Sequence, residues 1–466
     1  MILIDDILKV NGSLKNPKNT ICKKYNRVNI NSLEVKKGEV FFALKGETND
    51  GHNYIEDVIG RKAGLIFVNI NWYNKNKKKY KKDVFYVVKD TTIALGELAF
   101  HYKNRMNIPI LGVAGSNGKT TTKDIICSVL LKKFNVLKTE GNFNNHIGLP
   151  LTLLNIQDKH NFCVAELGSN HFKELEYLCK IAEPDFGLVT NIGKEHLEFF
   201  KNIKGVAKEE FTLYDYVGNN GSMCFYNLDD KIINNYKDTH KHKSFTYSYK
   251  YNSDVKGYNL GYDNKFSPRI EYKYKGKKYI VRVNTFGKHS FYNGLAAIAV
   301  GLYFGISPEQ ISNTLNHIKN ISQKRMEYFE CSGIKVINDT YNSNPCSVKL
   351  GLETVKEFFT KGKKHIVISD MLEMGSKSAK EHFEVGKLIK QLNFNFVYTY
   401  GQMSYHTFEG CKGINNNNFY FENKVDLTEF IKLNITKGDI VYFKGSRGMN
   451  MEEVVNKLFK NKTITR

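Results

Sequence analysis

The residues best suited to chemistry in this 466-residue chain lie in one short segment, between an apolar run and a helical pattern. The segment reads, in order, Gly115, Ser116, Asn117, Gly118, Lys119, Thr120 and Thr121. Glycines let backbone N–H groups close around phosphate oxygens, and the start of a helix adds a positive dipole end. Lys119 would bring a full charge to the β- and γ-phosphates, and the Thr120 hydroxyl would bind Mg²⁺. The segment therefore predicts an ATP site, although Val113 stands where the standard pattern has its first glycine.

Two further residues stand at the ends of the strands predicted next along the chain. Glu166 follows the apolar run 162–165, and His196 comes shortly after the run 186–190. Because the carboxyl ends of parallel strands meet at one edge of a sheet, both side chains are expected on the side of the nucleotide loop. A carboxylate and an imidazole together suit a divalent cation that neutralises charge during phosphoryl transfer. The predicted ligands of Mg²⁺ are therefore Thr120, Glu166 and His196.

A parallel sheet must bring these residues together, and the middle of the chain has the pattern of one. Apolar runs of strand length occur at 108–114, 162–165 and 186–190. Between the first two, residues 121–134 carry apolar side chains on one helical face. Strands alternating with helices indicate a doubly wound sheet. The pattern becomes β-like between 223 and 286, which predicts an antiparallel extension that a helix over 292–304 closes.

The regions on either side have α/β patterns of their own. Residues 1–106 contain apolar runs at 40–44, 65–69 and 84–88. From about residue 320, strands are predicted at 335–338, 365–369, 396–400 and 440–444, with a helix at 449–459. We therefore expect an α/β protein of three domains, 1–106, 107–319 and 320–466, and the chain length suits about three domains of ordinary size.

The composition, 41% hydrophobic and 25% charged, is that of a globular protein. No run of about 18 apolar residues occurs. Residues 1–6 have neither a basic leader nor a cleavable apolar segment, so we expect a cytoplasmic protein with no membrane partner. The eight cysteines form no Cys-x-x-Cys pair, which argues against a structural zinc site or a disulfide framework.

The net charge of +22 raises the question of a nucleic-acid partner. Lysine accompanies Asn, Ile and Tyr along the chain, as in 74–82 and 273–279. This mixture indicates a compositional bias, with lysines on solvated surfaces, and we expect no nucleic-acid partner. A basic surface also favours anionic small substrates such as ATP.

The motifs along nearly the whole chain resemble those of the Mur ligase family, the ATP-dependent amide ligases that build the peptide stem of peptidoglycan. Residues 115–121 match the family signature, with Ser116 in place of Thr. Other matching stretches follow in the family's order, at 141–150, 166–171, 196–198, 338–345, 370–375 and 444–447. The resemblance implies a small N-terminal UDP-binding domain, a central ATPase domain with a P-loop, and a C-terminal Rossmann-like domain that closes over the nucleotide.

The resemblance also implies roles for individual residues. On the nucleotide, it implies Asn293 at the adenine, with Arg325 and Asp339 from the C-terminal domain. On the substrates, it implies Ser32, Lys45, Gly46, His52, Asn142, Asn144, Asn145, Tyr341, Asn342 and Asn344. One departure lies at 31–33, where Asn-Ser-Leu replaces the family's Asp-Ser-Arg and removes an expected basic contact.

A second departure concerns the carbamylated lysine that many relatives carry after the metal-binding histidine. Aligning 206–214 on its aromatic residue places Glu210 at the modified position, with Lys208 as the nearest lysine of that segment. We expect the Glu210 carboxylate to do the carbamate's electrostatic work, with carbamylated Lys208 as the alternative. The implied catalytic residues are Lys119, Glu166 and His196, with Glu210 or Lys208.

The implied reaction joins D-alanyl-D-alanine to UDP-N-acetylmuramoyl-tripeptide through an acyl phosphate, catalysed by a monomer. One competing hypothesis is a family member that adds a single amino acid, lysine or diaminopimelate. The diaminopimelate-adding member usually carries an Asp-Asn-Pro-Arg motif, which is absent from this sequence. Two more distant hypotheses are a P-loop ATPase that acts on nucleic acid and a non-catalytic member of the family.

Overall fold

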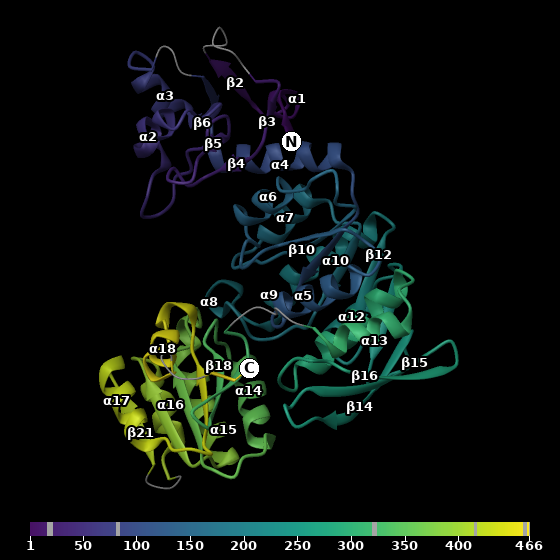
Figure 1. Cartoon of the computed structure of the whole chain (residues 1–466), viewed down its shortest axis with the longest axis vertical. Coiled ribbons are helices and arrows are strands. Elements are labelled where there is room, and N and C mark those ends of the chain that lie inside the picture. Colours follow the sequence, from purple (N-terminus) through teal and green to yellow (C-terminus); the bar gives the residue numbers. More distant parts are fainter. Residues whose placement is uncertain (16–21, 81–83, 319–323, 414–416, 460–463, 466) are drawn as a thin grey trace. The chain divides into compact units, whose positions relative to one another are not determined.

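The computed structural model describes residues 1–466 except 16–21, 81–83, 319–323, 414–416, 460–463 and 466 (Figure 1). The described strands form four sheets in a mixed α/β fold, as predicted. Contacts divide the chain into two compact units. Unit 1 comprises 1–113, 134–169 and 173–187, and unit 2 comprises 114–133, 170–172 and 188–466. The two predicted boundaries between the three domains stay a prediction, and the second falls outside the described residues.

Unit 1 begins with β1 (Ile2–Leu3), which pairs antiparallel with β3 (Lys24–Tyr25) in a two-stranded sheet. It also contains a five-stranded sheet in the order β2-β7-β6-β5-β4. The strands are β2 (Gly12–Lys15), β4 (Val28–Asn29), β5 (Val40–Phe42), β6 (Leu65–Asn69) and β7 (Phe85–Val88). In this sheet only β2 pairs antiparallel to its neighbour, and the strands predicted at 40–44, 65–69 and 84–88 are confirmed. The helices are α1 (Ile4–Leu8), α2 (Ile55–Gly60), α3 (Ile70–Asn76) and α4 (Thr91–Met106), the last capped by the Asp90 side chain.

The rest of unit 1 carries part of the central sheet. Strand β10 (Phe162–Glu166) pairs in parallel with both β8 (Ile110–Ala114) and β9 (Val136–Lys138). All residues of β8 and β10 are buried, as expected for a parallel sheet covered on both faces. Helices α6 (Gly148–Leu153) and α7 (Glu174–Ala182) complete this part.

In unit 2 the central sheet continues through β11 (Phe186–Val189), β12 (Met223–Asn227) and β13 (Ser244–Ser248). It ends in β14 (Val255–Tyr262), β15 (Pro268–Tyr274) and β16 (Lys277–Arg282), which pair antiparallel with one another. The predicted antiparallel extension is therefore confirmed for these strands, whereas β12 and β13 within the predicted range pair in parallel and continue the central sheet. The complete order is β16-β15-β14-β13-β12-β11-β8-β10-β9. The helices are α5 (Lys119–Leu130), α8 (Leu197–Phe200), α9 (Ile203–Glu210), α10 (Thr212–Asn219), α11 (Lys231–Thr239), α12 (Ser290–Tyr303) and α13 (Pro308–Asn316).

The last part of unit 2 is a seven-stranded sheet in the order β21-β20-β19-β22-β18-β17-β23. Its parallel strands are β18 (Ile334–Asp339), β19 (Lys364–Ser369), β20 (Phe396–Tyr400), β21 (Asn418–Phe421) and β22 (Ile440–Lys444). The antiparallel strands are β17 (Glu327–Cys331) and β23 (Ile464–Thr465). The helices are α14 (Pro345–Glu357), α15 (Ser378–Leu392), α16 (Ser404–Cys411), α17 (Lys424–Asn434) and α18 (Glu452–Phe459).

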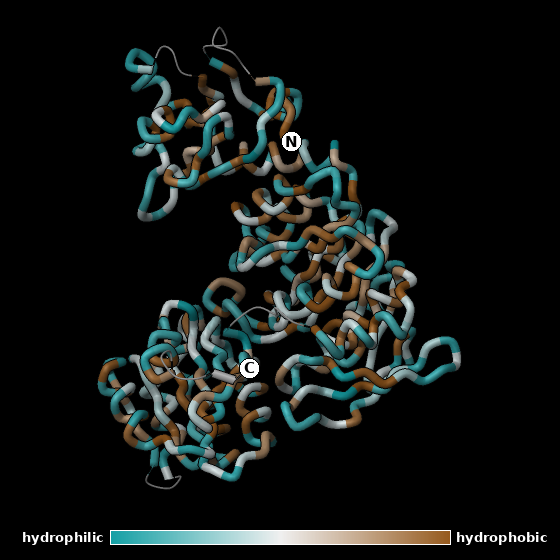
Figure 2. Tube along the Cα trace, viewed as in Figure 1, coloured by the Kyte–Doolittle hydropathy of each residue, from teal (hydrophilic) through white to brown (hydrophobic). Residues whose placement is uncertain are grey.

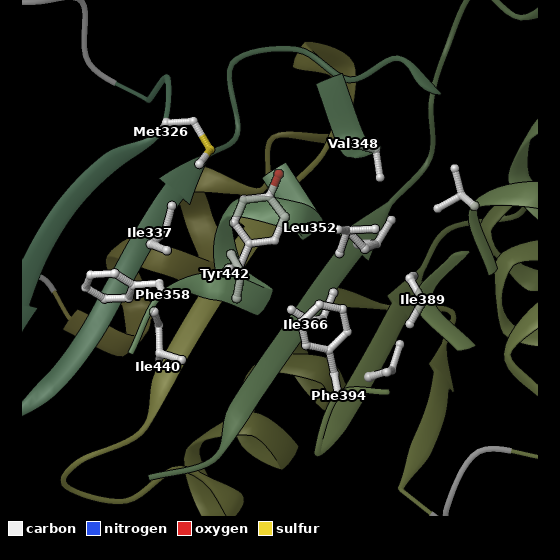
Figure 3. Close-up of a cluster of buried hydrophobic side chains, with 14 of the residues drawn as sticks. Met326, Ile337, Val348, Leu352, Phe358, Ile366, Ile389, Phe394, Ile440 and Tyr442 are labelled. Carbon is white, nitrogen blue, oxygen red and sulfur yellow. The ribbon is translucent and has the colours of Figure 1, made fainter. Parts of the chain in front are cut away.

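This sheet has an apolar core on each face, as the predicted Rossmann-like layers require. Figure 3 shows one core, in which Ile337, Ile366 and Tyr442 of the strands pack with Leu352 and Ile389 of α14 and α15. The other face packs against α17 and α18. Hydrophobic and hydrophilic segments are interspersed through both units (Figure 2). None of the described helices is long and apolar enough to cross a membrane.

Candidate active site

The predicted phosphate loop lies between β8 and the N-terminus of α5, and its two glycines have a backbone that other residues rarely adopt. Gly115 has φ +115° and Gly118 has φ +79°. A Cβ atom at Gly115 would lie 2.4 Å from Thr190 Oγ1, and one at Gly118 would lie 2.9 Å from Asn293 Oδ1. Both positions therefore require glycine for conformational and for steric reasons.

The segment that follows β11 holds this loop in shape. The Ser116 N–H donates to Asn191 O (2.9 Å) and the Asn117 N–H donates to Asn191 Oδ1 (3.1 Å). Thr190 Oγ1 donates to Asn117 O (2.7 Å), and the Gly193 N–H donates to Ser116 Oγ (2.8 Å). The loop is thus fixed mainly through its backbone, which suits a cradle for phosphate oxygens.

Lys119 is the first residue of α5, and its side chain folds back over the loop. Its ammonium donates to Gly115 O (2.5 Å) and lies 3.6 Å from Glu195 Oε2. Glu195 is buried, and its other oxygen has no hydrogen-bond partner among the described residues. Lys119 and the buried Glu195 therefore place opposite charges close together at the positive end of the α5 dipole. Thr120 and Thr121 are also buried.

The structure brings Glu210 to this loop and leaves Lys208 in solvent. Glu210 is 1% exposed and its Oε2 accepts a hydrogen bond from the Gly115 N–H (2.5 Å). Its Oε1 has no hydrogen-bond partner among the residues that the structure describes. Burial raises the pKa of Glu210 to about 7, against the opposing effect of the Lys119 charge. Lys208, two residues earlier on α9, is exposed.

His196 precedes α8 in a left-handed conformation, with φ +43°. Its Nδ1 lies 2.6 Å from Glu373 Oε2 and its Nε2 lies 3.9 Å from Glu195 Oε2. Burial lowers the pKa of His196, but contact with Glu373 and the charge of Glu195 outweigh burial and raise it. Neither Glu195 nor Glu373 was predicted from the sequence. The signals were present, because Glu195 adjoins His196 and Glu373 lies in the motif 370–375.

Glu166 ends β10 in unit 1, in register with Val113, two residues before Gly115. It is 1% exposed, and its N–H donates to Thr139 Oγ1 (3.0 Å). Its Oε1 accepts a hydrogen bond from Asn144 Nδ2 (2.9 Å). A predicted metal ligand and a predicted substrate residue are therefore in direct contact.

The neighbouring asparagines differ in their surroundings. Asn145 Oδ1 accepts hydrogen bonds from the Ile147 N–H (3.1 Å) and the Gly148 N–H (2.9 Å), so it stabilises the start of α6. Asn142 is exposed. Of the three predicted asparagines, Asn144 forms a hydrogen bond to Glu166 and Asn145 stabilises a helix start.

The predicted uridine-nucleotide residues lie in the N-terminal sheet region of unit 1. His52 is buried, and its Nε2 accepts a hydrogen bond from the Asn69 N–H (3.0 Å). Its Nδ1 lies 2.6 Å from Asp50 Oδ1, so Nδ1 carries the proton in this arrangement. Burial raises the pKa of Asp50, but hydrogen bonds from His52 outweigh burial and lower it. Ser32 is buried, whereas Lys45 and Gly46 are exposed.

Asp339 and Arg325 lie near the carboxyl end of β18. The Asp339 carboxylate accepts from Lys444 Nζ (2.7 Å), the Tyr442 hydroxyl (3.2 Å) and the Met326 N–H (3.2 Å). The guanidinium carbon of Arg325 lies 3.7 Å from the centre of the Tyr341 ring. Asp339 thus forms a buried charge pair, and Arg325 stacks on a predicted substrate residue.

Asn344 links the C-terminal sheet region to the phosphate loop. Its Oδ1 caps α14 by accepting from the Ser347 N–H (2.8 Å), and its Nδ2 donates to Asn117 Oδ1 (2.9 Å). Asn342 Oδ1 accepts from the Ser343 N–H (2.8 Å). In the central region, Asn293 Oδ1 accepts from the Thr122 hydroxyl (3.1 Å).

Within the described part of the chain, no three His, Cys, Asp or Glu side chains form a cluster that could hold a metal ion. The predicted set includes a threonine hydroxyl, and Mg²⁺ usually takes few protein ligands beside phosphate and water oxygens. The ligand set of Thr120, Glu166 and His196 therefore stays a prediction.

Comparison with known proteins agrees with these motifs. Residues 113–301 match the Mur ligase middle domain, and residues 324–447 match the Mur ligase glutamate ligase domain. The UDP-N-acetylmuramoyl-tripeptide–D-alanyl-D-alanine ligase of Bacillus subtilis (strain 168) is 33% identical over 97% of each chain. A crystal structure of MurF from Acinetobacter baumannii is 26% identical, with a TM-score of 0.88 over 98% of this chain and 99% of its own.

A second solved structure is MurF from Thermotoga maritima in complex with ADP, 25% identical with a TM-score of 0.82 over 93% of this chain and 97% of its own. The two family models together cover more than half of the chain, and the alignment with the Bacillus protein spans nearly all of it. The resemblance drawn from the motifs is confirmed. The chain belongs to the Mur ligase family, in the group of the UDP-N-acetylmuramoyl-tripeptide–D-alanyl-D-alanine ligases.

Proposed function

We propose that this chain uses ATP to join D-alanyl-D-alanine to UDP-N-acetylmuramoyl-tripeptide, in the cytoplasm and as a monomer. The observation that carries the proposal is the loop at 115–119, whose glycines, backbone donors and Lys119 are arranged for a triphosphate. The relatives named for this reaction match over nearly their full length. The relative solved with ADP supports a nucleotide as one substrate.

The phosphates of ATP would lie on the loop's backbone N–H groups at the start of α5. Lys119 supplies the positive charge there, and Glu195 holds its ammonium close to the loop before substrate binds. The tripeptide's terminal carboxylate attacks the γ-phosphorus in line, and ADP leaves with the electron pair of the broken bond. The amine of the dipeptide then attacks the acyl carbon, loses a proton, and releases phosphate. Exclusion of water protects the acyl phosphate from hydrolysis.

The residues around the loop suit Mg²⁺, which would neutralise phosphate charge when bound. Glu195 and Glu210 each have a buried carboxylate oxygen with no hydrogen-bond partner among the described residues. Hard oxygen ligands of this kind are what Mg²⁺ prefers. Thr120, Glu166 and His196 are the other proposed ligands. The burial of Glu210 beside Gly115, with Lys208 exposed, supports Glu210 as the replacement for a carbamylated lysine.

The test is release of ADP and phosphate across a panel of UDP-muramyl peptides, amines and nucleic acids. We expect turnover only when UDP-N-acetylmuramoyl-tripeptide and D-alanyl-D-alanine are both present. Lys119→Ala should lower kcat/KM by about 100-fold or more, because it removes a cation from the developing phosphate charge. Lys387→Ala, at an exposed ion pair with Glu384 on α15, is the matched control and should change little.

Two outcomes would contradict the proposal. Turnover with a single amino acid in place of the dipeptide would assign the chain to another ligase of the family. Turnover that DNA or RNA stimulates, without the muramyl peptide, would indicate an ATPase that acts on nucleic acid.

A further inference from the structure

A group of cations lies at the carboxyl edge of the C-terminal sheet. Strands β18 and β22 are adjacent and parallel, with Asp339 opposite Lys444. Tyr341 follows the first strand and Arg447 follows the second, so the two residues leave the sheet at the same edge. Ligands of open α/β sheets bind at this edge. The edge is therefore the part of the C-terminal region best placed to bind a substrate.

Two guanidinium groups lie close to the Tyr341 ring. The guanidinium carbon of Arg325 is 3.7 Å from the centre of its ring, and that of Arg447 is 5.9 Å away. An aromatic ring beside a guanidinium restricts its orientation and offers an apolar surface next to the charge. Such a surface suits the small methyl side chains of a dipeptide of alanine.

A carboxylate of the chain already binds to the same cations. Glu452 Oε1 lies 3.0 Å from Arg447 Nη1 and 3.0 Å from Lys324 Nζ. Glu452 Oε2 is buried and has no hydrogen-bond partner among the described residues. Burial raises the pKa of Glu452, but hydrogen bonds and the charges of Lys324 and Arg447 outweigh burial and lower it. The pair of cations is thus arranged around an ionised carboxylate.

Arg447 is an exposed cation of this group and has donors to spare. Its side chain is 60% exposed, whereas that of Lys444 is 3% exposed and is held by Asp339. A guanidinium has five N–H donors in a fixed fork that matches a carboxylate. Its contact with Glu452 involves Nη1, and most of its donors can therefore face a ligand in solvent.

The proposed reaction needs a cation to bind the carboxylate of its second substrate, in addition to the cation at the phosphate loop. Its second substrate reacts through its amine and carries a free carboxylate at the opposite end. We propose that Arg447, assisted by Lys324, binds the C-terminal carboxylate of the incoming dipeptide beside the Tyr341 ring. This inference rests on the proposed function, because it assigns the site for one of that reaction's substrates.

The test compares D-alanyl-D-alanine with its C-terminal carboxamide, which has the same shape without the charge. The wild-type enzyme should prefer the acid by about 10- to 100-fold in kcat/KM, the range of a charge-assisted hydrogen bond. Arg447→Gln should raise KM for the acid and remove most of this preference. Arg447→Lys should retain part of the preference, because it keeps the charge and loses the fork. KM for ATP should stay within about twofold in both variants.

Arg269→Gln is the matched control, since it removes an exposed arginine from β15 and should leave the preference for the acid intact. Thermal unfolding of each variant checks that it is folded. A preference that survives in Arg447→Gln overturns the inference. A raised KM for ATP with an unchanged preference also overturns it, and assigns Arg447 to phosphate instead. If the wild-type enzyme does not use D-alanyl-D-alanine at all, the proposed function fails first, and the two failures are distinguishable.

Discussion

The predicted phosphate loop and the edge of the C-terminal sheet hold their polar and charged groups in two different ways. The loop is made of one continuous stretch of chain, whose backbone groups hydrogen-bond to the backbone and side chains of residues 190 and 191 and whose two glycines have positive φ. The edge is made of side chains from separate segments, held by pairs such as Asp339–Lys444 and Glu452–Arg447. Backbone donors follow from local sequence, whereas opposed side chains depend on which strands lie next to each other.

The largest effect should come from placing a side chain in the loop. Gly115→Ala would force φ +115° on alanine and bring its Cβ 2.4 Å from Thr190 Oγ1. We expect kcat/KM for ATP to fall by about 100-fold or more, and the free energy of unfolding to fall by about 2–4 kcal/mol. Steady-state kinetics and urea denaturation measure the two changes.

Gly221→Ala separates strain from steric clash. Gly221 has φ +71°, and a Cβ atom added there would have no other atom within 4 Å. The free energy of unfolding of this variant should fall by about 1 kcal/mol, and its activity should be unchanged. If Gly115→Ala and Gly221→Ala lowered the free energy of unfolding equally, the fit of the loop against Thr190 would be unimportant.

The next largest effect should come from the edge of the C-terminal sheet. Asp339→Asn leaves the buried Lys444 ammonium without its counter-charge, which should reduce the free energy of unfolding by about 3 kcal/mol. Urea denaturation of Glu384→Gln provides the comparison, because its pair with Lys387 is exposed and should contribute less than about 1 kcal/mol. If Asp339→Asn and Glu384→Gln lowered the free energy of unfolding by similar amounts, the buried pair Asp339–Lys444 would not be what stabilises this edge.

Titration of Glu210 should give an intermediate effect at the loop. Its folded-state pKa of about 7 lies above the usual value of 4.5, so the folded state favours the protonated form. Its contribution to stability is present below pH 4.5 and is lost as the pH rises through 7. Between pH 5 and 7.5, the free energy of unfolding of the metal-free protein should therefore fall less in Glu210→Gln than in the wild type. The difference between the two falls should reach up to about 3 kcal/mol. Parallel pH profiles of the two proteins would rule out a raised pKa.

The smallest effect should come from the hydrogen bond between the two regions. Asn344→Ala removes both the cap of α14 and the donor to Asn117, and should cost about 1 kcal/mol for the cap alone. Asn344→Asp keeps the capping oxygen and loses the donor, so its stability should stay within about 0.5 kcal/mol. Both variants lose the hydrogen bond to Asn117. If KM for ATP rises by about twofold to fivefold in both, that rise comes from the loss of this bond and not from the loss of the cap.

The strands around the site were predictable because they are short and almost entirely apolar. Strands β6, β10 and β22 agree with their predicted ranges to within a residue or match them fully. Helix starts were less accurate. Helix α5 was predicted from residue 121, where the apolar pattern begins, but it starts at Lys119. Its start is set by Gly118 at the end of the loop. Glu195 and Glu373 were missed because a single acidic residue has no distinguishing pattern in sequence.

The sequence by itself determined the family, the α/β class and the position of the phosphate loop. These depend on contiguous residues, whose glycines, lysine and apolar runs act through local backbone geometry and burial. Only the tertiary structure decided that Glu210 and not Lys208 reaches Gly115, that Glu373 reaches His196, and that Arg325 and Arg447 lie close to the Tyr341 ring. Such contacts join residues far apart in the chain. Their distances are set by the register of neighbouring strands and by which helix face is buried.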